Sequence, residues 1–570
     1  MAPPPRFDAV LPAPVLLPAA AGAAPSTTAR PRARPPGLAI VLASLWIAGA
    51  GNLPLWHGLQ ALGLLDGVRG WIFGASLGLM VAAACALLLG LLAWRWTLKP
   101  AITLLLALSA GGVYFMLRYG VVIDTTMAQN VLQTDRHEAL DLLSPWLLAT
   151  MATIAVAPAV LLWRTPLHYG PWLRRAGHNG LLVLLALAVL AGVALASFQT
   201  LGSAMRNHKA VRYQINPFNT LYAVGHLATR SLRRGPMQLL PIGEDVRLGA
   251  RYQAQARPPL LVLVLGETGR SGNFGINGYG RNTTPELAQE QVASFRDAWS
   301  CGTSTAASVP CMFSHLGRSA FEDRRSNYEN LLDVAQRAGL AVLWVDNQAG
   351  CKGVCDRVAQ ASTTALQDLA LCAGDSCWDG MLLAQLDQRI AALPAERRAR
   401  GVLVVLHQMG SHGPAYYQRA PVAFKRFLPE CTSTALQDCS RAEVVNAYDN
   451  TIAYTDHVLA STIGWLKAQS RQADTAMVYV ADHGESLGEN NLYLHGMPYA
   501  LAPDVQKRVP WITWLSPGFE RRSGVTTDCL RRRDGRVSHD NYFHSVLGLL
   551  DLQTHVYQRT LDVYADCAGT

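Results

Sequence analysis

The sequence predicts a chain in two parts, an α-helical membrane domain of five spans and an α/β domain whose mostly parallel sheet is covered by helices on both faces. Three observations support this prediction. Of the 570 residues, 50% are hydrophobic and only 16% are charged, which is too apolar for a chain that lies wholly in water. Long apolar runs fill residues 37–198, and short Val- and Leu-rich runs alternate with helical patterns after residue 258.

The amino-terminal residues 1–36 are rich in Pro and Ala, carry four arginines, and lack an apolar stretch or a cleavage signal. We expect them to form a disordered cytoplasmic tail. Each apolar run that follows has about the 20 helical residues needed to cross ~30 Å of hydrocarbon. The predicted spans of the membrane domain (37–198) are residues 38–56, 71–94, 101–123, 146–162 and 179–198.

The distribution of basic residues predicts the orientation of the spans. Loops 95–99 and 164–175 carry more Lys and Arg than the short loops between them, so we expect them in the cytoplasm. An odd number of spans then places everything after residue 198 in the periplasm of a bacterial inner-membrane protein. The net charge of +9 is scattered, with arginines beside apolar runs, which favours an anionic membrane surface over nucleic acid as the partner.

The cysteines agree with this topology. All of the 11 cysteines except Cys85, which falls inside a span, lie after residue 198 in closely spaced couples. Zinc thiolates are the alternative, but the unequal spacings lack the regular pattern of a zinc ribbon, and disulfides suit the periplasm. The predicted pairs are Cys301–Cys311, Cys351–Cys355, Cys372–Cys377 and Cys431–Cys439, with Cys529–Cys567 left by elimination.

Two further segments complete the predicted organisation. Residues 199–257 have mixed polarity and form a periplasmic connector, in which 213–223 and 227–232 suggest short amphipathic helices on the bilayer; an ordinary linker fits the pattern equally well. Residues 258–570 form the α/β domain. Its predicted strands are 260–265, 341–345, 401–406 and 476–480, and its predicted helices include 328–338, 380–392 and 441–468.

Polar residues follow the predicted strands where an open parallel sheet binds its ligands, outside the carboxyl ends of the strands. Glu267 follows the first strand, and Asp482 and His483 follow the fourth. Singly, each residue would more often be a helix cap or a hydrogen-bonding group of the core. Together, two carboxylates and an imidazole at one sheet edge form a ligand set for a zinc-type cation, with a coordination position left open for a nucleophile.

A loop rich in hydroxyl groups lies between Cys301 and Cys311. A hydroxyl is a poor nucleophile at neutral pH unless a neighbouring cation lowers its pKa. The spacing alone leaves four candidate nucleophiles open: Thr303, Ser304, Thr305 and Ser308.

Five segments in the same order resemble the lipid A phosphoethanolamine transferases, a family that includes the mobilised colistin-resistance enzymes. They are VLGET at 264–268, SCGTSTA at 300–306, SVPCMFS at 308–314, HQMGSHGPAY at 407–416 and DHGESLGEN at 482–490. The resemblance covers nearly the whole chain and implies an alkaline-phosphatase/sulfatase-like catalytic domain at 258–570. Residues 269–273 read GRSGN where some relatives have Ala-Arg-Ala-Asp-His, which argues against a catalytic role for this loop.

The resemblance also assigns individual roles. It implies that Thr305 is the nucleophile that becomes modified with phosphoethanolamine. The implied ligands of a zinc ion are Glu267, Thr305, Asp482 and His483. Lys352, His412 and His495 match positions at the phosphoryl group or at a further zinc, and Glu485 matches a position close to the metal. A cationic Lys and imidazoles suit these places because they can stabilise phosphoryl charge or protonate a leaving alkoxide.

A second resemblance lies in the loop after the third span, residues 124–138. Asn130, Thr134 and Glu138 recur every four residues, which would place them on one face of a helix. In the family, the matching positions help to hold the headgroup of the lipid donor, and a carboxylate there would suit an ammonium group. The alternative is an amphipathic surface helix with solvated polar residues.

The implied function is transfer of phosphoethanolamine from phosphatidylethanolamine to a phosphate of lipid A by a monomeric enzyme. The added amine would lower the negative surface charge and weaken the binding of polymyxins. A related transferase or hydrolase that acts on core heptose, a glycan or a protein is the nearest alternative. A sulfatase fits less well, because residues 311–314 lack the Pro and Arg of the Cys-x-Pro-x-Arg motif. A membrane sensor or transporter also fits less well, because the predicted spans contain few ionisable residues that could form an ion or solute pathway.

Overall fold

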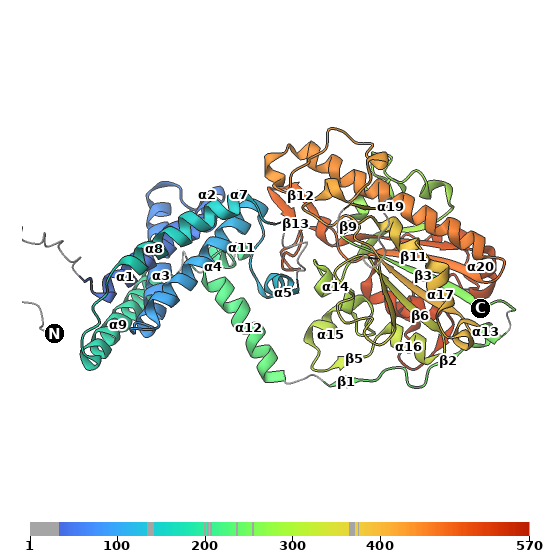
Figure 1. Ribbon diagram of the computed structural model, residues 1–570, viewed down its shortest axis with the longest axis horizontal. Helices are drawn as coiled ribbons and strands as arrows, with labels where there is room; N and C mark the ends of the chain where they lie inside the picture. Colours follow the sequence, from blue (N-terminus) through green and yellow to red (C-terminus); the bar gives the residue numbers. More distant parts are fainter. Residues whose placement is uncertain are drawn as a thin grey trace, which may run out of the picture.

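The molecule has two lobes, one built of long helices and one built around a sheet, with α5 (Thr125–Gln133) and α12 (Phe218–Arg234) between them (Figure 1). The computed structural model describes residues 33–133, 142–198, 201, 204–205, 208–234, 238–253, 256–363, 371–373 and 376–568. Residues 1–32 of the expected tail lie outside the described residues.

Five helices of the first lobe are long and apolar enough to cross a membrane, as the sequence predicts. They are Pro36–Ala61 (α1, η1 and α2), Gly67–Leu91 (α3), Leu98–Tyr119 (α4), Pro145–Arg164 (α7, η2 and α8) and Trp172–Ala196 (α9). The first span continues beyond the predicted end at residue 56. At the break between α1 and α2, Asn52 Nδ2 donates hydrogen bonds to Ile47 O and Asn216 O, both at 2.8 Å. Backbone carbonyls left free inside a membrane need such partners.

The fourth span is irregular for a similar reason. Pro158 lacks an N–H, so the carbonyl of Ile154 loses its helical donor, and the chain forms a π turn at Met151–Val156. Trp46 Nε1 of the first span donates to Ile154 O at 3.0 Å and replaces that donor. The side chain of Trp46 therefore ties the first and fourth spans together.

Among the described residues of the connector, a single helix covers most of the two segments for which the sequence suggested separate amphipathic helices. Helix α12 runs without a break over Phe218–Arg234, and the short helix α11 (Lys209–Arg212) precedes it. The predicted start at residue 213 is wrong, because residues 213–217 form turns ahead of Phe218. Tyr222 is among its outward-facing residues.

The second lobe contains an eight-stranded sheet in the order β15-β4-β14-β11-β3-β10-β6-β7. Its centre consists of the four predicted parallel strands, which read as continuous apolar runs because both faces are covered. They are β3 (Pro259–Gly266), β6 (Ala341–Asp346), β10 (Val402–His407) and β11 (Asp474–Ala481). β14 (Arg508–Leu515) is antiparallel to both β11 and β4 (Ala293–Trp299), and β7 (Ala359–Ser362) and β15 (Val537–Ser538) form the edges.

Helices cover both faces of this sheet, with α19 (Arg441–Gln469) above it and α15 (Gly317–Asp323) and α16 (Leu331–Arg337) below it in Figure 1. α19 and α16 agree with the predicted helices. The prediction of one helix over 380–392 is wrong: a 3-10 turn (Asp379–Leu383) and α17 (Leu386–Ala391) are separated at Gln385, whose φ is 56°.

Smaller elements surround the central sheet. The two-stranded pairs are β1 (Leu239–Leu240) with β5 (Asn327–Tyr328), β2 (Arg247–Leu248) with β16 (Leu552–Gln553), β8 (Cys372–Ala373) with β9 (Ser376–Cys377), and β12 (Ser486–Glu489) with β13 (Leu492–Leu494). The remaining helices of this lobe are α13 (Ala250–Gln253), α14 (Thr305–Met312), α18 (Ala395–Arg398), α20 (Pro517–Ser523), α21 (Thr527–Arg531) and α22 (Tyr542–Leu549).

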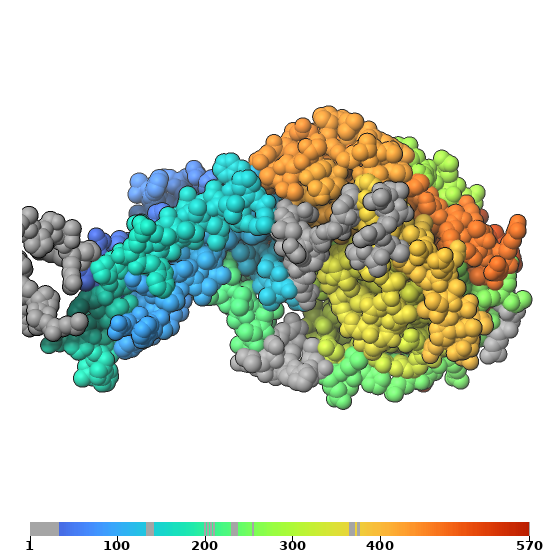
Figure 2. Space-filling model, in the orientation of Figure 1, coloured from blue at the N-terminus to red at the C-terminus, as the bar shows by residue number. Residues whose placement is uncertain are grey.

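Disulfides and a small apolar contact hold this arrangement together. The structure forms the four disulfides that the cysteine spacing predicts and also Cys529–Cys567, the pair left by elimination. Cys85 is a free, buried thiol. The lobes meet where Val122, just after α4, packs against Met497 and Ala502. Figure 2 shows the broad second lobe in contact with the narrower helical lobe along this side.

Candidate active site at the carboxyl edge of the sheet

Two neighbouring strands bring the predicted acidic and imidazole side chains together. β3 and β11 are parallel and in register, with Ala481 opposite Gly266. Glu267, Asp482 and His483 follow directly, and their ligand atoms all lie within 4.8 Å of one another. All three side chains are buried, which fits a site closed to bulk water.

Hydrogen bonds orient this group so that its remaining atoms converge. His483 Nδ1 lies 2.9 Å from the carbonyl oxygen of Gly484, so Nδ1 carries the proton and Nε2 faces the carboxylates. Asp482 Oδ1 accepts from the backbone N–H groups of Thr268 and His483 at 3.0 and 2.7 Å. Its Oδ2 is buried and has no hydrogen-bond partner within the described residues. An orphaned carboxylate oxygen beside an imidazole nitrogen fits a zinc-type cation.

The two buried carboxylates of Glu267 and Asp482 require a nearby positive charge. Burial lowers the pKa of His483, but the adjacent Asp482 and Glu267 carboxylates outweigh burial and raise that pKa to about 10. Burial and the charge of Glu267 raise the pKa of Asp482 to about 6. Two buried carboxylates this close need a compensating charge, either a proton on the imidazole or a bound cation.

Helix α14 brings Thr305 to the same point. Thr305 is its first residue, and its Oγ1 donates to Glu267 Oε2 at 2.9 Å and lies 3.5 Å from His483 Nε2. The amino end of a helix favours negative charge, which suits both an ionised hydroxyl and a phosphoryl group.

The other three candidate hydroxyls do not contact this group. Thr303 Oγ1 donates to Met497 O at 2.6 Å, and Ser308 Oγ accepts a backbone N–H of the loop at 2.8 Å. Ser304 precedes α14 and its Oγ has no hydrogen-bond partner among the described residues. Among the four, the geometry therefore selects Thr305.

Two further histidines gather beside the metal-ligand group. The ring of His495 lies 4.3 Å from that of His483 and 5.5 Å from that of His412, measured between centroids. His495 Nδ1 is 3.3 Å from Glu485 Oε1, and the other oxygen of Glu485 accepts from Tyr416 OH at 3.0 Å. The structure thus brings the predicted His412, His495 and Glu485 to one side of the site.

A cavity of about 930 Å³ opens next to α14 and is lined by both lobes. Asp124 and Gln129 line it from the helical lobe, and Ala306 and Lys352 from the sheet lobe. Lys352 Nζ donates to Ala349 O at 3.2 Å, which leaves two of its three donors for a ligand. The cavity is large enough for a polar lipid headgroup.

Of the predicted headgroup residues, only Asn130 can be placed. It lies on α5 (Thr125–Gln133), and a Cβ added at Gly496 would come within 3.3 Å of its Nδ2. Asn130 is therefore next to the His495 side of the site. Thr134 and Glu138 lie outside the described residues.

Sequence reasoning missed two residues that hold the site in place. Gln348 Nε2 donates to Glu267 Oε2 at 2.8 Å, so this carboxylate oxygen receives both an amide and the Thr305 hydroxyl. Gln348 lies two residues after the end of β6, at the same edge of the sheet as Glu267.

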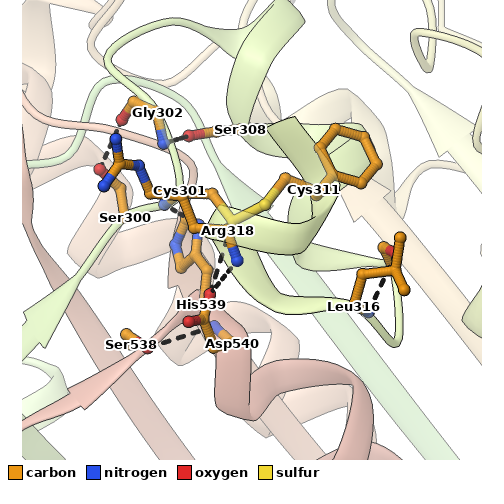
Figure 3. Close-up of a disulfide and its surroundings, with 12 residues drawn as sticks. Ser300, Cys301, Gly302, Ser308, Cys311, Leu316, Arg318, Ser538, His539 and Asp540 are labelled. Carbon is orange, nitrogen blue, oxygen red and sulfur yellow. Dashed lines mark hydrogen bonds between the residues drawn. A yellow bond between two sulfur atoms is a disulfide. The ribbon is translucent and has the colours of Figure 1, made fainter. Parts of the chain in front are cut away.

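The second missed residue, His539, joins the two halves of the site. Its Nδ1 accepts from the backbone N–H of Cys301 at 3.0 Å, and its Nε2 donates to the carbonyl of Ala481 at 3.0 Å. Burial lowers the pKa of His539 to about 3, so the ring is neutral. Figure 3 shows it beside the Cys301–Cys311 disulfide, next to Asp540. No spacing in the sequence relates position 539 to either partner.

Comparison with known proteins agrees with this geometry. Residues 259–552 match the sulfatase family, and residues 81–232 match a family described as phosphoethanolamine transferase EptA/EptB. The chain is 36% identical to phosphoethanolamine transferase EptA of Escherichia coli K12, over 93% of this chain and 96% of that protein. It is 37% identical to phosphatidylethanolamine transferase Mcr-1 of Escherichia coli, over 84% of this chain and 88% of that protein.

A solved structure extends the likeness to both lobes. The integral membrane lipooligosaccharide phosphoethanolamine transferase A of Neisseria meningitidis superposes with a TM-score of 0.88 at 32% identity. The match covers 94% of this chain and 99% of that one.

Proposed function

The chain belongs to the phosphoethanolamine transferase family of EptA and the Mcr enzymes, and we propose that it transfers phosphoethanolamine from phosphatidylethanolamine to a phosphate of lipid A. One observation carries the proposal. The Thr305 hydroxyl, at the amino end of α14, is hydrogen-bonded into the buried group of Glu267, Asp482 and His483 beside a cavity shared by both lobes.

The residues present fit a zinc ion. Asp482 Oδ2 is buried without a hydrogen-bond partner in the described part of the chain, and His483 Nε2 points at the same place. The ligands in this proposal are Glu267, Thr305, Asp482 and His483. When bound, the cation supplies Lewis acidity that lowers the pKa of the neighbouring hydroxyl.

In the first step, Thr305 Oγ1 attacks the phosphorus of phosphatidylethanolamine. The Oγ–P bond forms and the bond from phosphorus to the diacylglycerol oxygen breaks. Glu267 Oε2, which accepts the Thr305 hydroxyl at 2.9 Å, is placed to take its proton. His495, whose Nδ1 faces the Glu485 carboxylate at 3.3 Å, is placed to protonate the departing diacylglycerol oxygen.

In the second step, a phosphate oxygen of lipid A attacks the same phosphorus and the P–Oγ bond breaks. Glu267 returns its proton to Thr305 Oγ1, and His495 regains a proton from the hydroxyl of the attacking phosphate group. Lys352 and His412 stabilise the charge on the transferring phosphoryl oxygens in both steps. Asn130 acts with Thr134 and Glu138 on the ethanolamine headgroup, where the carboxylate attracts the ammonium.

The two-lobed architecture suits this reaction because both substrates reside in a bilayer. In this proposal, residues 37–198 anchor a monomer in the bacterial inner membrane, 199–257 connect, and 258–570 act in the periplasm. Attachment of a cationic amine to lipid A lowers its negative charge and gives resistance to polymyxins. Nucleic acid has no part in this scheme.

Intact-protein mass after incubation with phosphatidylethanolamine tests the first step. The wild-type chain should gain one phosphoethanolamine group on Thr305, and Thr305→Ala should gain none. Ser304→Ala is the matched control, since the Ser304 hydroxyl contacts no described partner, and it should be modified at the wild-type level.

Mass analysis of lipid A from cells with and without the enzyme tests the acceptor. Addition to a lipid A phosphate supports the proposal. Unmodified lipid A together with a modified core sugar would contradict it and favour the alternative acceptor.

A further inference from the structure

A row of cationic and aromatic side chains starts at the wall of the active-site cavity and leads away from it. Arg318 lines the cavity and its guanidinium lies 3.6 Å from the centroid of the Tyr499 ring, which also lines it. Lys507 Nζ lies 5.4 Å from the Tyr499 ring and 5.8 Å from the Trp299 ring. Arg536 completes the row, 4.1 Å from the Trp299 ring. We call these five residues the cation–aromatic row.

The row lies at the junction with the helical lobe. Tyr499 is flanked by Met497 and Ala502, which pack against Val122 at the end of the third span. The row therefore begins close to the point where the chain enters the bilayer, and a lipid headgroup can reach it from there.

The row also contacts residues 300–311, which we call the nucleophile loop because they include Thr305. The backbone carbonyl of Lys507 accepts the N–H of Ser300 at 2.8 Å, and the N–H of Arg318 donates to Asp540 at 2.7 Å, beside the Cys301–Cys311 disulfide (Figure 3). A ligand held on the row is thus fixed relative to the loop that presents Thr305.

The carboxylates that pair with Arg318 and Lys507 are more than half exposed. Arg318 Nε is 3.1 Å from Glu322, whose side chain is 55% exposed, and Lys507 Nζ is 3.3 Å from Asp504, which is 68% exposed. Such exposed pairs contribute little, so a phosphate can displace them. Arg536 is exposed and has no carboxylate within 4 Å in the described ranges. Arginine offers a planar fork for phosphate oxygens, and the aromatic rings hold the cations in place.

We propose that the cation–aromatic row binds the phosphate of the acceptor lipid A that does not react, while the other phosphate of the same molecule approaches Thr305. The inference rests on the function proposed above. It assigns to Arg318, Lys507 and Arg536 a role in acceptor recognition that is separate from the covalent chemistry. The donor lipid, whose single phosphate reacts at Thr305, does not need the row.

The test separates the two half-reactions with full-length enzyme in nanodiscs. The first readout is the rate at which phosphatidylethanolamine modifies Thr305, and the second is kcat/KM for transfer from pre-modified enzyme to purified lipid A. Arg536→Ala and Lys507→Ala should leave the first rate within about twofold, and each should lower the second by about tenfold, the scale of one charge-assisted phosphate contact. Arg536→Lys should retain most of the wild-type value.

Monophosphoryl lipid A identifies the group that is bound. Wild-type enzyme should prefer bisphosphorylated over monophosphoryl lipid A by about tenfold, and the Lys507→Ala/Arg536→Ala double variant should lose that preference. Arg471→Ala, which removes an exposed arginine beyond the end of α19, is the matched control and should retain the preference.

Two results would overturn the inference while the proposed function stands: a preference that persists in the double variant, or a first half-reaction that falls as far as the second. The same loss for both forms of lipid A would indicate general attraction to an anionic bilayer and would also overturn it. A wild-type chain that never acquires phosphoethanolamine would instead refute the proposed function, and the inference with it.

Discussion

Two regions of the site, which we call its inner and outer ends, differ in how their charged side chains are buried and paired. At the inner end, the metal-ligand group of Glu267, Asp482 and His483 is at most 1% exposed and is held by short hydrogen bonds. At the outer end, Arg318 and Lys507 of the cation–aromatic row are 34% and 13% exposed and pair with carboxylates that are more than half exposed. Under the proposed function, the residues of the covalent chemistry are fixed in advance, whereas those of acceptor recognition can adjust to their ligand.

This division follows from the cost of burying charge. A charge inside the lobe must be matched by a partner at close range, because an unmatched one costs several kcal/mol. A charge at the surface is solvated, so its pairs contribute only about 0–1 kcal/mol. Changes at the inner end should therefore cause large losses, and changes at the outer end small ones.

The largest loss should follow removal of one inner charge. Asp482→Asn preserves shape but removes the negative charge of the buried Oδ2. We expect the variant to bind less zinc and to lose more activity than the roughly 10- to 100-fold typical of an outer-shell change. Metal content by elemental analysis and the rate of Thr305 modification measure both effects. A variant that retains metal and rate would remove the contrast between the two ends.

The next largest loss should come from His539, which spans the two halves of the inner end. His539→Ala leaves the buried Cys301 N–H and Ala481 C=O without their partner. Each unsatisfied group costs about 1–3 kcal/mol of stability, and a shift of the nucleophile loop by about 1 Å can slow the chemistry by ~100-fold. We expect a lower Tm and a 10- to 100-fold slower modification of Thr305, of the size that loss of a supporting partner gives.

Two conservative variants of His539 distinguish positioning from general packing. His539→Asn keeps an acceptor at the place of Nδ1, and His539→Gln keeps a donor at the place of Nε2. The hydrogen bond from the Cys301 N–H to position 539 positions the nucleophile loop. His539→Asn should therefore restore the rate of Thr305 modification more than His539→Gln does, at a similar Tm. Equal rates for the two variants would show that His539 only fills space.

A smaller effect is expected at Gln348. Its amide orients one oxygen of the Glu267 carboxylate, and loss of such a partner lowers metal affinity by about 10- to 100-fold. Gln348→Ala should therefore weaken zinc binding in competition with a chelator, while saturating zinc restores most of the activity. If zinc does not restore activity, Gln348 contributes more than orientation of a ligand.

The inner end also shows how far sequence reasoning reaches. The apolar runs of β3 and β11 place Glu267 and Asp482 at one edge, because parallel strands in a doubly covered sheet are continuous and apolar. Thr305 was one of four equivalent hydroxyls on spacing alone, and the family resemblance selected it. The hydrogen bond from Thr305 to Glu267 supplies the physical reason, since the other three hydroxyls point elsewhere.

Local sequence patterns do not predict contacts between segments that are distant in the chain. β14 was missed because it is antiparallel and begins Arg-Val-Pro, so it lacks the signature of a buried parallel strand. The helix expected over 380–392 fails because tertiary hydrogen bonds fix its first turn: Asp379 accepts from Asn347 and from the backbone of Met409 and Gly410. The cation–aromatic row joins residues from four separate segments (Trp299, Arg318, Tyr499 with Lys507, and Arg536), so no local sequence pattern indicates it.

The final prediction concerns the effect of acid on the inner end, through His539. Burial lowers the pKa of His539 to about 3 in the folded protein, against about 6.5 in an unfolded chain. Between these values the unfolded chain binds more protons, so stability should fall as pH falls through this window, by up to about 1.4 kcal/mol per pH unit.

The comparison of wild type with His539→Asn isolates this contribution. Asp456 and Asp562, whose pKa values burial raises to about 6, give the opposite slope but are present in both proteins and cancel. Between pH 7.5 and 5.5, the Tm of zinc-loaded wild type should therefore fall further than that of the variant, by roughly 2 °C per pH unit for a domain of this size. Parallel Tm curves would mean that His539 takes up its proton without unfolding, and the neutral bridge between Cys301 and Ala481 would then not be a requirement of the fold.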